Sequence, residues 1–335
     1  MGKKLFTIVL VACLLLFYGI SKADTIKLTY SNFFPPTHFN SKLAEEWAKE
    51  IEKRTNGKVS FSFFHGGALL KGPEIYDGVM KGATDVGMSL FAYTAGRFPL
   101  MEALDLPIGY PSGKVATLVA NDFYNKFKPK ELEGVKVLYL HAHGPGLLHS
   151  KKEVKTLEDL KGLKVRCTGF SAKAAAALGA VPVAMGQGEA YEALQKGVVD
   201  ATLSPIEVLK GWKQAEVIKY TVECYSVGYT TAMYVIMNKA KWDALPDDVK
   251  KVFEEVSKEW IAKHAEGWDK ADQEGREYTL SLKNTIIPLS KEESDRWASA
   301  VRPVIDAQLK ALTEKGLPGK EAIDFIKESI AKYSK

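Results

Sequence analysis

The feature that most constrains the fold is an alternation of short apolar strands with amphipathic helices near the start of the chain. The segments TIKLTY (25–30) and KVSFSFF (58–64) place apolar residues at every second position, as half-buried strands do. Between them, Leu43, Trp47 and Ile51 recur at helical spacing before an Asn-Gly stop. This order predicts an α/β protein in which helices pack on mainly parallel sheets.

The same alternation continues through the first half of the chain. The patterns predict a helix at 75–81, strands at 86–90 and 135–140, a short helix at 157–161 and a strand at 163–167. Two segments of the chain are similar to each other. GVMKGATDVGM and ALQKGVVDATL each join a helix end, a Lys-Gly stop and a strand. Two such units far apart favour two α/β lobes, although joints of this kind also look alike in unrelated α/β proteins.

A long helical segment follows in the C-terminal third. Residues 246–282 contain no proline after the first position, and the segment is too long for a helix that packs within one lobe. We therefore predict a helix that lies across both lobes as a strut. Gly267 and Gly275 are candidate bending points within it.

The N-terminus has the pattern of a secretory signal peptide. Lys3 and Lys4 precede an uncharged apolar run that ends at the triplet Ser21-Lys22-Ala23, which predicts a signal peptide over residues 1–23 and a periplasmic mature protein. A lipid-attachment box ending at Cys13 and a retained membrane anchor are the alternatives. Removal of 1–23 deletes three lysines and no acid, so the formal net charge falls from +5 to +2. That balance does not favour nucleic acid as a partner.

Signatures of enzymes are missing from the sequence. It has no phosphate-binding loop, no Gly-x-Ser-x-Gly elbow and no dinucleotide fingerprint. His141, His143 and His149 would suit a zinc site, but no carboxylate or cysteine stands nearby at matching spacing. Cys167 is a possible nucleophile without an evident base, or a partner for Cys224 in a disulfide. We predict a protein that is not an enzyme and holds no metal or cofactor.

Arg166 is the charged residue that most clearly indicates a binding site. A Thr-x-x-Asp box begins the helix at 157–161, and the strand at 163–167 then carries Arg166 near its carboxyl end. In open α/β sheets that end faces the ligand crevice. The next helix begins at once and adds backbone amides, so the position suits a carboxylate. A structural salt bridge with a neighbouring acid explains the spacing equally well.

Several segments together resemble a known family. DLKGLKVR, GAVPVAMGQGEAYEALQKGVVDATLSP and MYVIMNKAKWDALPDDVKKVFEEV, in this order behind a signal peptide, resemble the substrate-binding proteins of tripartite ATP-independent periplasmic (TRAP) transporters, the DctP-like family. The resemblance covers residues 26–330. It implies a two-lobed, periplasmic-binding-protein-like α/β fold with mixed sheets and a long helix spanning both lobes. The expected division is 24–143 plus 231–270 for lobe I, and 144–230 plus 271–335 for lobe II.

The resemblance also assigns roles to individual positions. It places Arg166 on the family's carboxylate-clamping arginine, and Ser204 where a polar helper such as asparagine usually stands. Gly146 stands where members that bind sialic acid have a second arginine. The charged residues that those members carry after the strand at 86–90 are replaced here by a segment that contains the predicted ligand-binding residues Leu90, Phe91 and Tyr93.

Further aromatic and apolar residues fall on segments expected at the mouth of the cleft. Phe33, Phe34, Met185, Tyr229 and His143 complete the predicted ligand-binding set, although each taken singly also suits core or hinge packing. Together they favour a monocarboxylate with an apolar or aromatic body, such as a 2-oxo or aromatic acid. A C4-dicarboxylate binder and a sensory receptor of the same fold are the alternatives. The implied partners are a small organic acid and the TRAP membrane permease subunits, and we expect a monomer.

Overall fold

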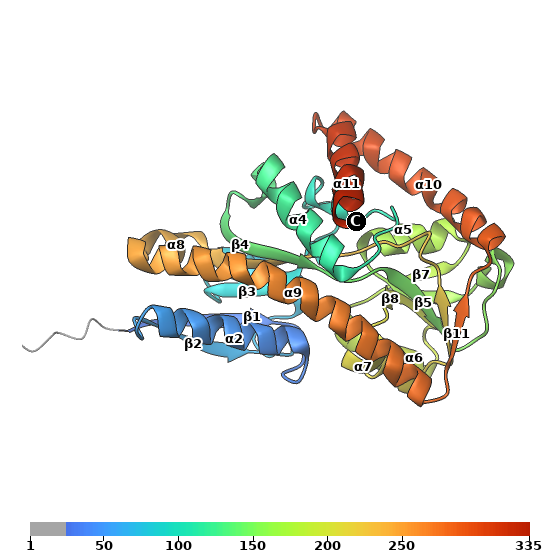
Figure 1. Ribbon diagram of the computed structural model, residues 1–335, viewed down its shortest axis with the longest axis horizontal. Helices are drawn as coiled ribbons and strands as arrows, with labels where there is room; N and C mark the ends of the chain where they lie inside the picture. The colour runs from blue at the N-terminus through green and yellow to red at the C-terminus, as the bar shows by residue number, and fades with distance from the viewer. Residues whose placement is uncertain (1–24) are drawn as a thin grey trace, which may run out of the picture.

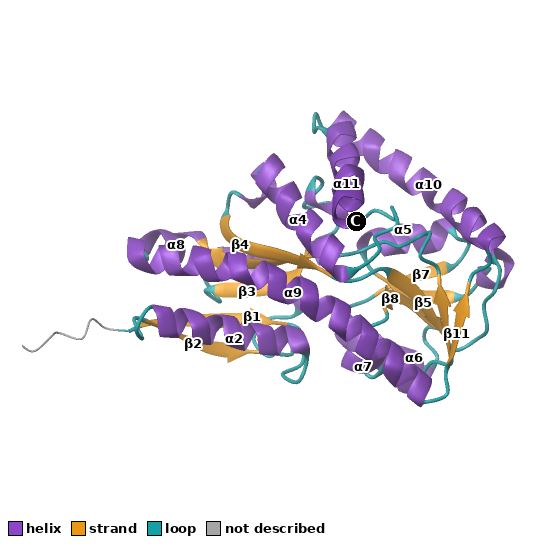
Figure 2. Cartoon of the chain, viewed as in Figure 1, coloured by secondary structure: helices purple, strands orange, loops and turns teal. Residues whose placement is uncertain are grey.

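Two mixed β-sheets form the centres of two lobes (Figures 1 and 2). The computed structural model describes residues 25–335, so the predicted signal peptide lies outside the described residues. The first sheet has the strand order β2-β1-β3-β10-β4. Its strands are β1 (Ile26–Asn32), β2 (Val59–Phe64), β3 (Val86–Leu90), β4 (Val135–Ala142) and β10 (Ala232–Asn238). β1 runs parallel to β2 and β3, whereas β10 is antiparallel to both of its neighbours.

The second sheet has six strands in the order β11-β9-β5-β8-β6-β7. They are β5 (Gly146–Ser150), β6 (Lys164–Cys167), β7 (Val181–Ala184), β8 (Ala201–Pro205), β9 (Tyr220–Glu223) and β11 (Thr285–Pro288). β6 is parallel to β7 and β8, and β5 is antiparallel to β8 and β9. The alternation of elements predicted mainly parallel sheets, but the strands that follow each crossing between lobes, β5 and β10, run antiparallel.

The helices cover the faces of these sheets (Figure 2). They are α2 (Phe39–Arg54), α3 (Ile75–Met80), α4 (Gly113–Phe127), α5 (Gly169–Ala177), α6 (Gln187–Lys196), α7 (Val208–Gly211), α8 (Lys239–Ala244), α9 (Asp247–Ser281), α10 (Lys291–Glu314) and α11 (Gly319–Tyr333). The first sheet is packed between two buried apolar clusters, one under α4 and α11 and one under α2 and α9. A third cluster fills the second lobe. No helix within residues 25–335 combines the length and the apolar character that a membrane crossing requires.

Helix α9 is the predicted strut. Its 35 residues run without interruption, a length of about 50 Å at the α-helical rise. The helix packs on α2, α4 and β4 in the first lobe and on α7 and β11 in the second (Figure 1). The two glycines are not breaks in it. A Cβ at Gly275 would lie 2.2 Å from the carbonyl oxygen of Ile206, so this glycine lets the second lobe approach the helix backbone.

This close approach predicts opposite effects for two glycine-to-alanine changes. Gly188, inside α6, has open space where a Cβ would stand, so Gly188→Ala is expected to raise the free energy of unfolding by up to about 1 kcal/mol. Gly275→Ala is expected to lower it by roughly 1–3 kcal/mol, because the clash is with backbone that cannot rotate away. Urea unfolding of both variants tests this, and a stabilised Gly275→Ala protein would contradict it.

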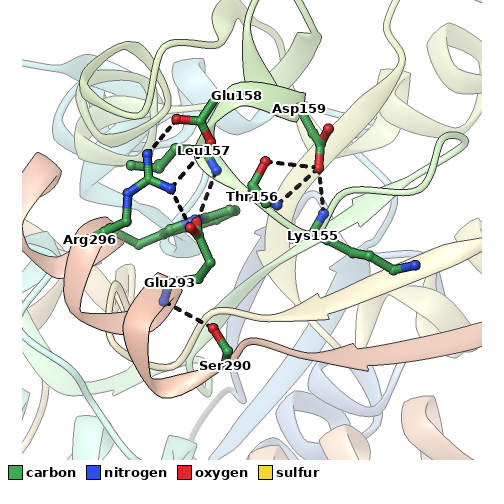
Figure 3. A network of polar contacts seen from close by, with 9 residues as sticks. Lys155, Thr156, Leu157, Glu158, Asp159, Ser290, Glu293 and Arg296 are labelled. Atoms are coloured by element: carbon green, nitrogen blue, oxygen red, sulfur yellow. Dashed lines mark hydrogen bonds and ion pairs between the residues drawn. The ribbon is translucent and has the colours of Figure 1, made fainter.

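Helix α10 forms a second bridge between the lobes. At its N-terminal end, Glu293 accepts a hydrogen bond from the backbone N–H of Leu157 (3.1 Å), and Arg296 pairs with both Glu158 and Glu293 (Figure 3). Ser290 caps the helix by accepting from the N–H of Glu293 (3.1 Å). These contacts tie the helix to the short 3₁₀ turn that precedes β6 in the second lobe.

The far end of α10 belongs to the first lobe. Val304 and Leu312 join the apolar cluster under α4, and the side-chain amide of Gln308 donates to the carbonyl of Pro99 (3.1 Å). Helix α11 then packs on α4. The expected placement of residues 271–335 in the second lobe therefore needs correction: α10 crosses back and α11 lies with the first. The apolar stripes of both helices predicted that they are buried, but they did not predict which lobe they pack against.

Candidate functional site

A cavity lies between the two lobes. The first sheet contributes loops that follow β1 and β3 and residues at the start of β10. The second contributes the carboxyl ends of β6 and β8 and the short helix α7, and α9 passes beside the cavity. The lining residues are Phe33, Phe34, Leu90, Tyr93, His143, Arg166, Thr168, Gln187, Ser204, Pro205, Glu207, Val208, Trp212, Tyr229, Thr231, Met233 and Trp268.

Arg166 reaches this cavity from β6 and is only 4% exposed. Its Nε and Nη2 donate to the carbonyl oxygen of Met185 at 3.2 and 3.0 Å, and its Nη1 donates to the hydroxyl of Ser204 at 3.2 Å. None of the ion pairs formed within residues 25–335 includes Arg166. The structural salt bridge considered from the sequence is thus not formed by the described chain. A buried guanidinium held only by neutral oxygens leaves its charge available to an anion.

Ser204 is positioned by a buried histidine. The Nε2 of His149 donates to the carbonyl oxygen of Ser204 (3.1 Å), so its Nδ1 accepts from the hydroxyl of Thr221 (3.0 Å). Burial lowers the pKa of His149 to about 4, which keeps the ring neutral. His149 therefore fixes β8 beside Arg166.

Aromatic side chains from both lobes also line the cavity. Phe33 and Phe34 lie with ring centroids 4.1 Å apart, and Tyr93 meets Phe33 edge-on at 5.3 Å. Trp212 of the second lobe stacks on Phe33 at 6.2 Å. Phe33, Phe34 and Tyr93 were predicted from the sequence, whereas Trp212 was missed. It follows a one-turn helix with no periodic pattern that would place it.

Polar contacts that involve lining residues also join the two lobes. The hydroxyl of Tyr93 accepts from the backbone N–H of Gln187 (3.1 Å). His38, at the N-terminus of α2, contacts Glu207 with an Nε2–Oε1 distance of 2.7 Å, and both side chains are buried. No pattern in the sequence indicates the pairing of His38 with Glu207, because they lie 169 positions apart and on different lobes.

Of the ten predicted ligand-binding residues, two do not present their side chains to the cavity. Phe91 is fully buried in the first-lobe core against Phe98 and Tyr234, both at 5.1 Å between ring centroids. Leu90 lines the cavity, whereas Phe91 begins the 3₁₀ turn Phe91–Thr94 that follows β3. Met185 contributes its carbonyl oxygen to Arg166 rather than its side chain.

Gly146 and Tyr229 together fill the position where the resemblance places a second arginine in other members. A Cβ on Gly146 would lie 1.9 Å from the Cε1 of Tyr229. The Tyr229 hydroxyl donates to the carbonyl of Leu203 (2.7 Å), which holds the ring over the glycine. The ring thus occupies the space that a longer side chain at Gly146 would need.

The histidines considered as zinc ligands have other partners. His141 stacks on His264 at 4.3 Å and its Nδ1 accepts from the indole N–H of Trp268 (3.0 Å). Burial holds the pKa of His141 well below its usual value. Within residues 25–335 no group of three or more His, Cys, Asp or Glu side chains is placed to hold a metal ion.

The two cysteines of the described chain are free and buried. Burial raises the pKa of Cys167, and it raises that of Cys224 to about 12, so the lowered thiol pKa that a nucleophile needs is absent at Cys167. We expect iodoacetamide to leave both thiols unmodified in the native protein at mildly alkaline pH and to alkylate both in denaturant. Mass spectrometry reads the result, and rapid native labelling of Cys167 would contradict the burial.

Comparison with known proteins identifies relatives along most of the chain. The model of the family described as bacterial extracellular solute-binding protein, family 7 (DctP) matches residues 30–311. The C4-dicarboxylate-binding periplasmic protein DctP of Rhodobacter capsulatus is 29% identical over 322 residues, which cover 92% of each chain.

Solved structures give the same result. A TRAP periplasmic solute-binding protein from Desulfovibrio salexigens, an open complex with the C-terminus of a symmetry mate in its ligand-binding site, is 35% identical, with a TM-score of 0.82 over 92% of this chain and 97% of that one. A TRAP solute-binding protein from Rhodoferax ferrireducens in complex with copurified benzoate is 29% identical, with a TM-score of 0.86 over 92% and 99%.

Proposed function

This chain belongs to the bacterial extracellular solute-binding proteins of family 7, and we propose that it is a periplasmic receptor that binds a monocarboxylate with an apolar or aromatic body and delivers it to a TRAP membrane permease. The observation that carries the proposal is Arg166, buried in the interlobe cavity without a carboxylate partner from residues 25–335. A ligand carboxylate would supply the missing charge and accept from the guanidinium in paired geometry.

The rest of the cavity favours a ligand with one acid group. Among residues 25–335, Arg166 is the only basic residue in the lining besides the neutral His143, and Glu207 is the only acidic one. A second carboxylate would therefore find no cation and would lie in a cavity that already contains a carboxylate. The aromatic wall of Phe33, Phe34 and Trp212 offers apolar surface instead, as an aromatic body requires.

Relatives bind acids of both kinds, so the lining decides between them. The Rhodobacter protein is named for C4-dicarboxylates, and the Rhodoferax protein holds benzoate. Closure of two lobes over the ligand would couple binding to the surface that a permease meets. The contacts of Tyr93 with Gln187 and of His38 with Glu207 support such closure, because they link the lobes through residues of the cavity lining.

Thermal shift against a panel of acids tests the ligand class. We expect benzoate-like and phenylacetate-like monocarboxylates to raise the melting temperature, since a ligand that binds only the folded state stabilises it by mass action. Succinate, malate and glucuronate are expected to give no shift at the same concentration. A panel in which only sugar acids or C4-dicarboxylates stabilise the protein would overturn the proposal.

A further inference from the structure

Resting on the proposed function, we infer that His38 and Glu207 form an interlobe latch that sets how slowly the closed receptor releases its ligand. His38 caps the N-terminus of α2 in the first lobe, and Glu207 directly precedes α7 in the second. Their Nε2 and Oε1 atoms are 2.7 Å apart, and the two residues are 3% and 2% exposed. Among the contacts between basic and acidic side chains within residues 25–335, this is the one in which both side chains are buried.

The cap of α2 determines which ring nitrogen of His38 carries the hydrogen. The Nδ1 of His38 accepts from the backbone N–H of Asn40 at 3.2 Å, so this nitrogen holds no proton. The ring hydrogen is therefore on Nε2, which donates to the carboxylate of Glu207. A buried hydrogen bond to a charged acceptor is stronger than one between neutral groups. The contact thus forms with a neutral imidazole and is still charge-assisted.

The second lobe leaves room for this contact and holds Glu207 in place. A Cβ at Gly211 would lie 1.8 Å from the Oε1 of Glu207 and 3.0 Å from the Nε2 of His38, so the two side chains can meet only beside a glycine. The backbone N–H of Glu207 donates to the carboxyl group of Asp272 on α9 at 3.1 Å. Glu207 is therefore attached to the helix on which both lobes pack, while its side chain contacts the first lobe.

The pair stands between two cavities. The second cavity is an outer groove between α2, α7 and α9, lined by residues within 37–46, 207–213 and 267–274. Glu207 is the one residue of the described chain that lines both the ligand cavity and this groove. His38 lines the groove alone, but its ring centroid lies 4.5 Å from that of Phe34 and 5.6 Å from that of Trp212, which both line the ligand cavity. The latch therefore adjoins the ligand, and His38 can be changed without removal of a lining residue.

Opening of the lobes has to break this contact. Because the two groups belong to different lobes, separation draws Nε2 away from Oε1 before water can fully hydrate either buried group. That cost falls on the step from the closed to the open arrangement, whereas binding begins with lobes that are apart and hydrated. The latch thus lengthens the time for which the receptor holds its ligand and changes the association rate little.

Stopped-flow displacement measures the release rate, and the probe is the acid of the thermal-shift panel that stabilises the wild-type protein most. His38→Phe retains a ring beside Phe34 and removes the donor, so we expect release at least about tenfold faster and association within about threefold of the wild-type rate. His65→Phe is the matched control, because His65 makes the same contact with Glu45 (Nε2–Oε1 3.1 Å) inside the first lobe. Its release rate should stay within about twofold of the wild-type rate.

Two further variants of His38 separate the latch from the helix cap. His38→Gln can still donate to Glu207 and is expected to restore part of the slow release. His38→Asn keeps an acceptor for the N–H of Asn40 but is too short to reach Glu207, so it should release the acid as fast as His38→Phe. It also provides a second test if the phenylalanine variant fails to fold.

Glu207→Gln distinguishes a latch from a direct contact between Glu207 and the ligand. If the two residues act together, His38→Phe combined with Glu207→Gln should release no faster than His38→Phe alone. Faster release in Glu207→Gln with wild-type release in His38→Phe would assign Glu207 to the ligand and overturn the latch. Wild-type release in both His38→Phe and His38→Asn would also overturn it.

These outcomes separate the latch from the proposed function. Either result against the latch leaves the proposed function intact, because the wild-type protein still binds the acid. A probe that proves to be a C4-dicarboxylate or a sugar acid would overturn the proposed ligand class, and the same variants would still test the latch with that acid. A wild-type protein that no acid of the panel stabilises would overturn both.

Discussion

Replacing Arg166 with methionine is expected to weaken binding of the carboxylate ligand by roughly 30-fold to several thousandfold, equivalent to about 2–5 kcal/mol. The guanidinium is 4% exposed and the described chain gives it only neutral oxygens, those of Met185 and Ser204. The bound carboxylate would lose its charge-assisted hydrogen bonds and remain desolvated between the lobes. Methionine fills a similar volume, so the change removes charge more than packing.

The same variant separates binding from stability. A buried cation without a counter-charge does not stabilise the unliganded fold, so Arg166→Met is expected to leave the free energy of unfolding unchanged or higher in the absence of ligand. Calorimetric titration and urea unfolding measure the two effects. Arg302→Met, at an exposed position on α10, is the matched control and should change neither. If Arg166→Met binds the carboxylate ligand with unchanged affinity, Arg166 does not hold the carboxylate.

The position of Arg166 could be predicted because it depends on local rules. The capping box at Thr156 and Asp159, the glycine stop and the short strand that follows are all set by neighbouring residues, and the structure confirms each. The carboxyl end of that strand then faces the crevice by the topology of α/β sheets. Phe33, Phe34 and Tyr93 follow from the same argument applied to β1 and β3.

Residues whose role depends on how the lobes meet could not be predicted in this way. Trp212 and Glu207 lie in and around a one-turn helix, and His38 caps a helix of the other lobe. Their contacts arise only when the two lobes are placed side by side. The prediction for Phe91 was wrong for a simpler reason. The strand at 86–90 was predicted with the bounds that β3 has, but its pattern did not indicate that Phe91 begins a 3₁₀ turn whose first side chain packs into the core.

The C-terminal helices show the same limit. Their apolar stripes indicate that they are buried but do not name the surface that covers them. Trp297 and Val301 of α10 enter the second-lobe core, while Val304 and Leu312 enter the first. Together with α9, this gives two helical connections between the lobes, so the proposed closure would have to be accommodated by both helices as well as by the two strand crossings.

Trp268 is where the strut helix, the core and the ligand cavity meet. The side chain is 1% exposed, packs edge-on against Phe39 at 4.9 Å and donates to the Nδ1 of His141 at 3.0 Å. Gly113 lies so close that a Cβ there would stand 2.4 Å from the Trp268 Cβ. Trp268→Ala is expected to lower the free energy of unfolding by about 3–5 kcal/mol, because it opens a cavity and leaves His141 without its donor.

A second buried tryptophan serves as the control for this variant. Trp297 on α10 is also fully buried and donates its indole N–H, to Glu293 at 3.2 Å, but it lies in the second-lobe core away from the ligand cavity. Trp297→Ala should therefore cost a similar amount of stability while the stabilisation gained on adding ligand stays at the wild-type value. In Trp268→Ala that gain should shrink, because the indole that lines the cavity is gone. If ligand stabilises both variants equally, Trp268 contributes only to the stability of the fold, and the proposal that it contacts the ligand is wrong.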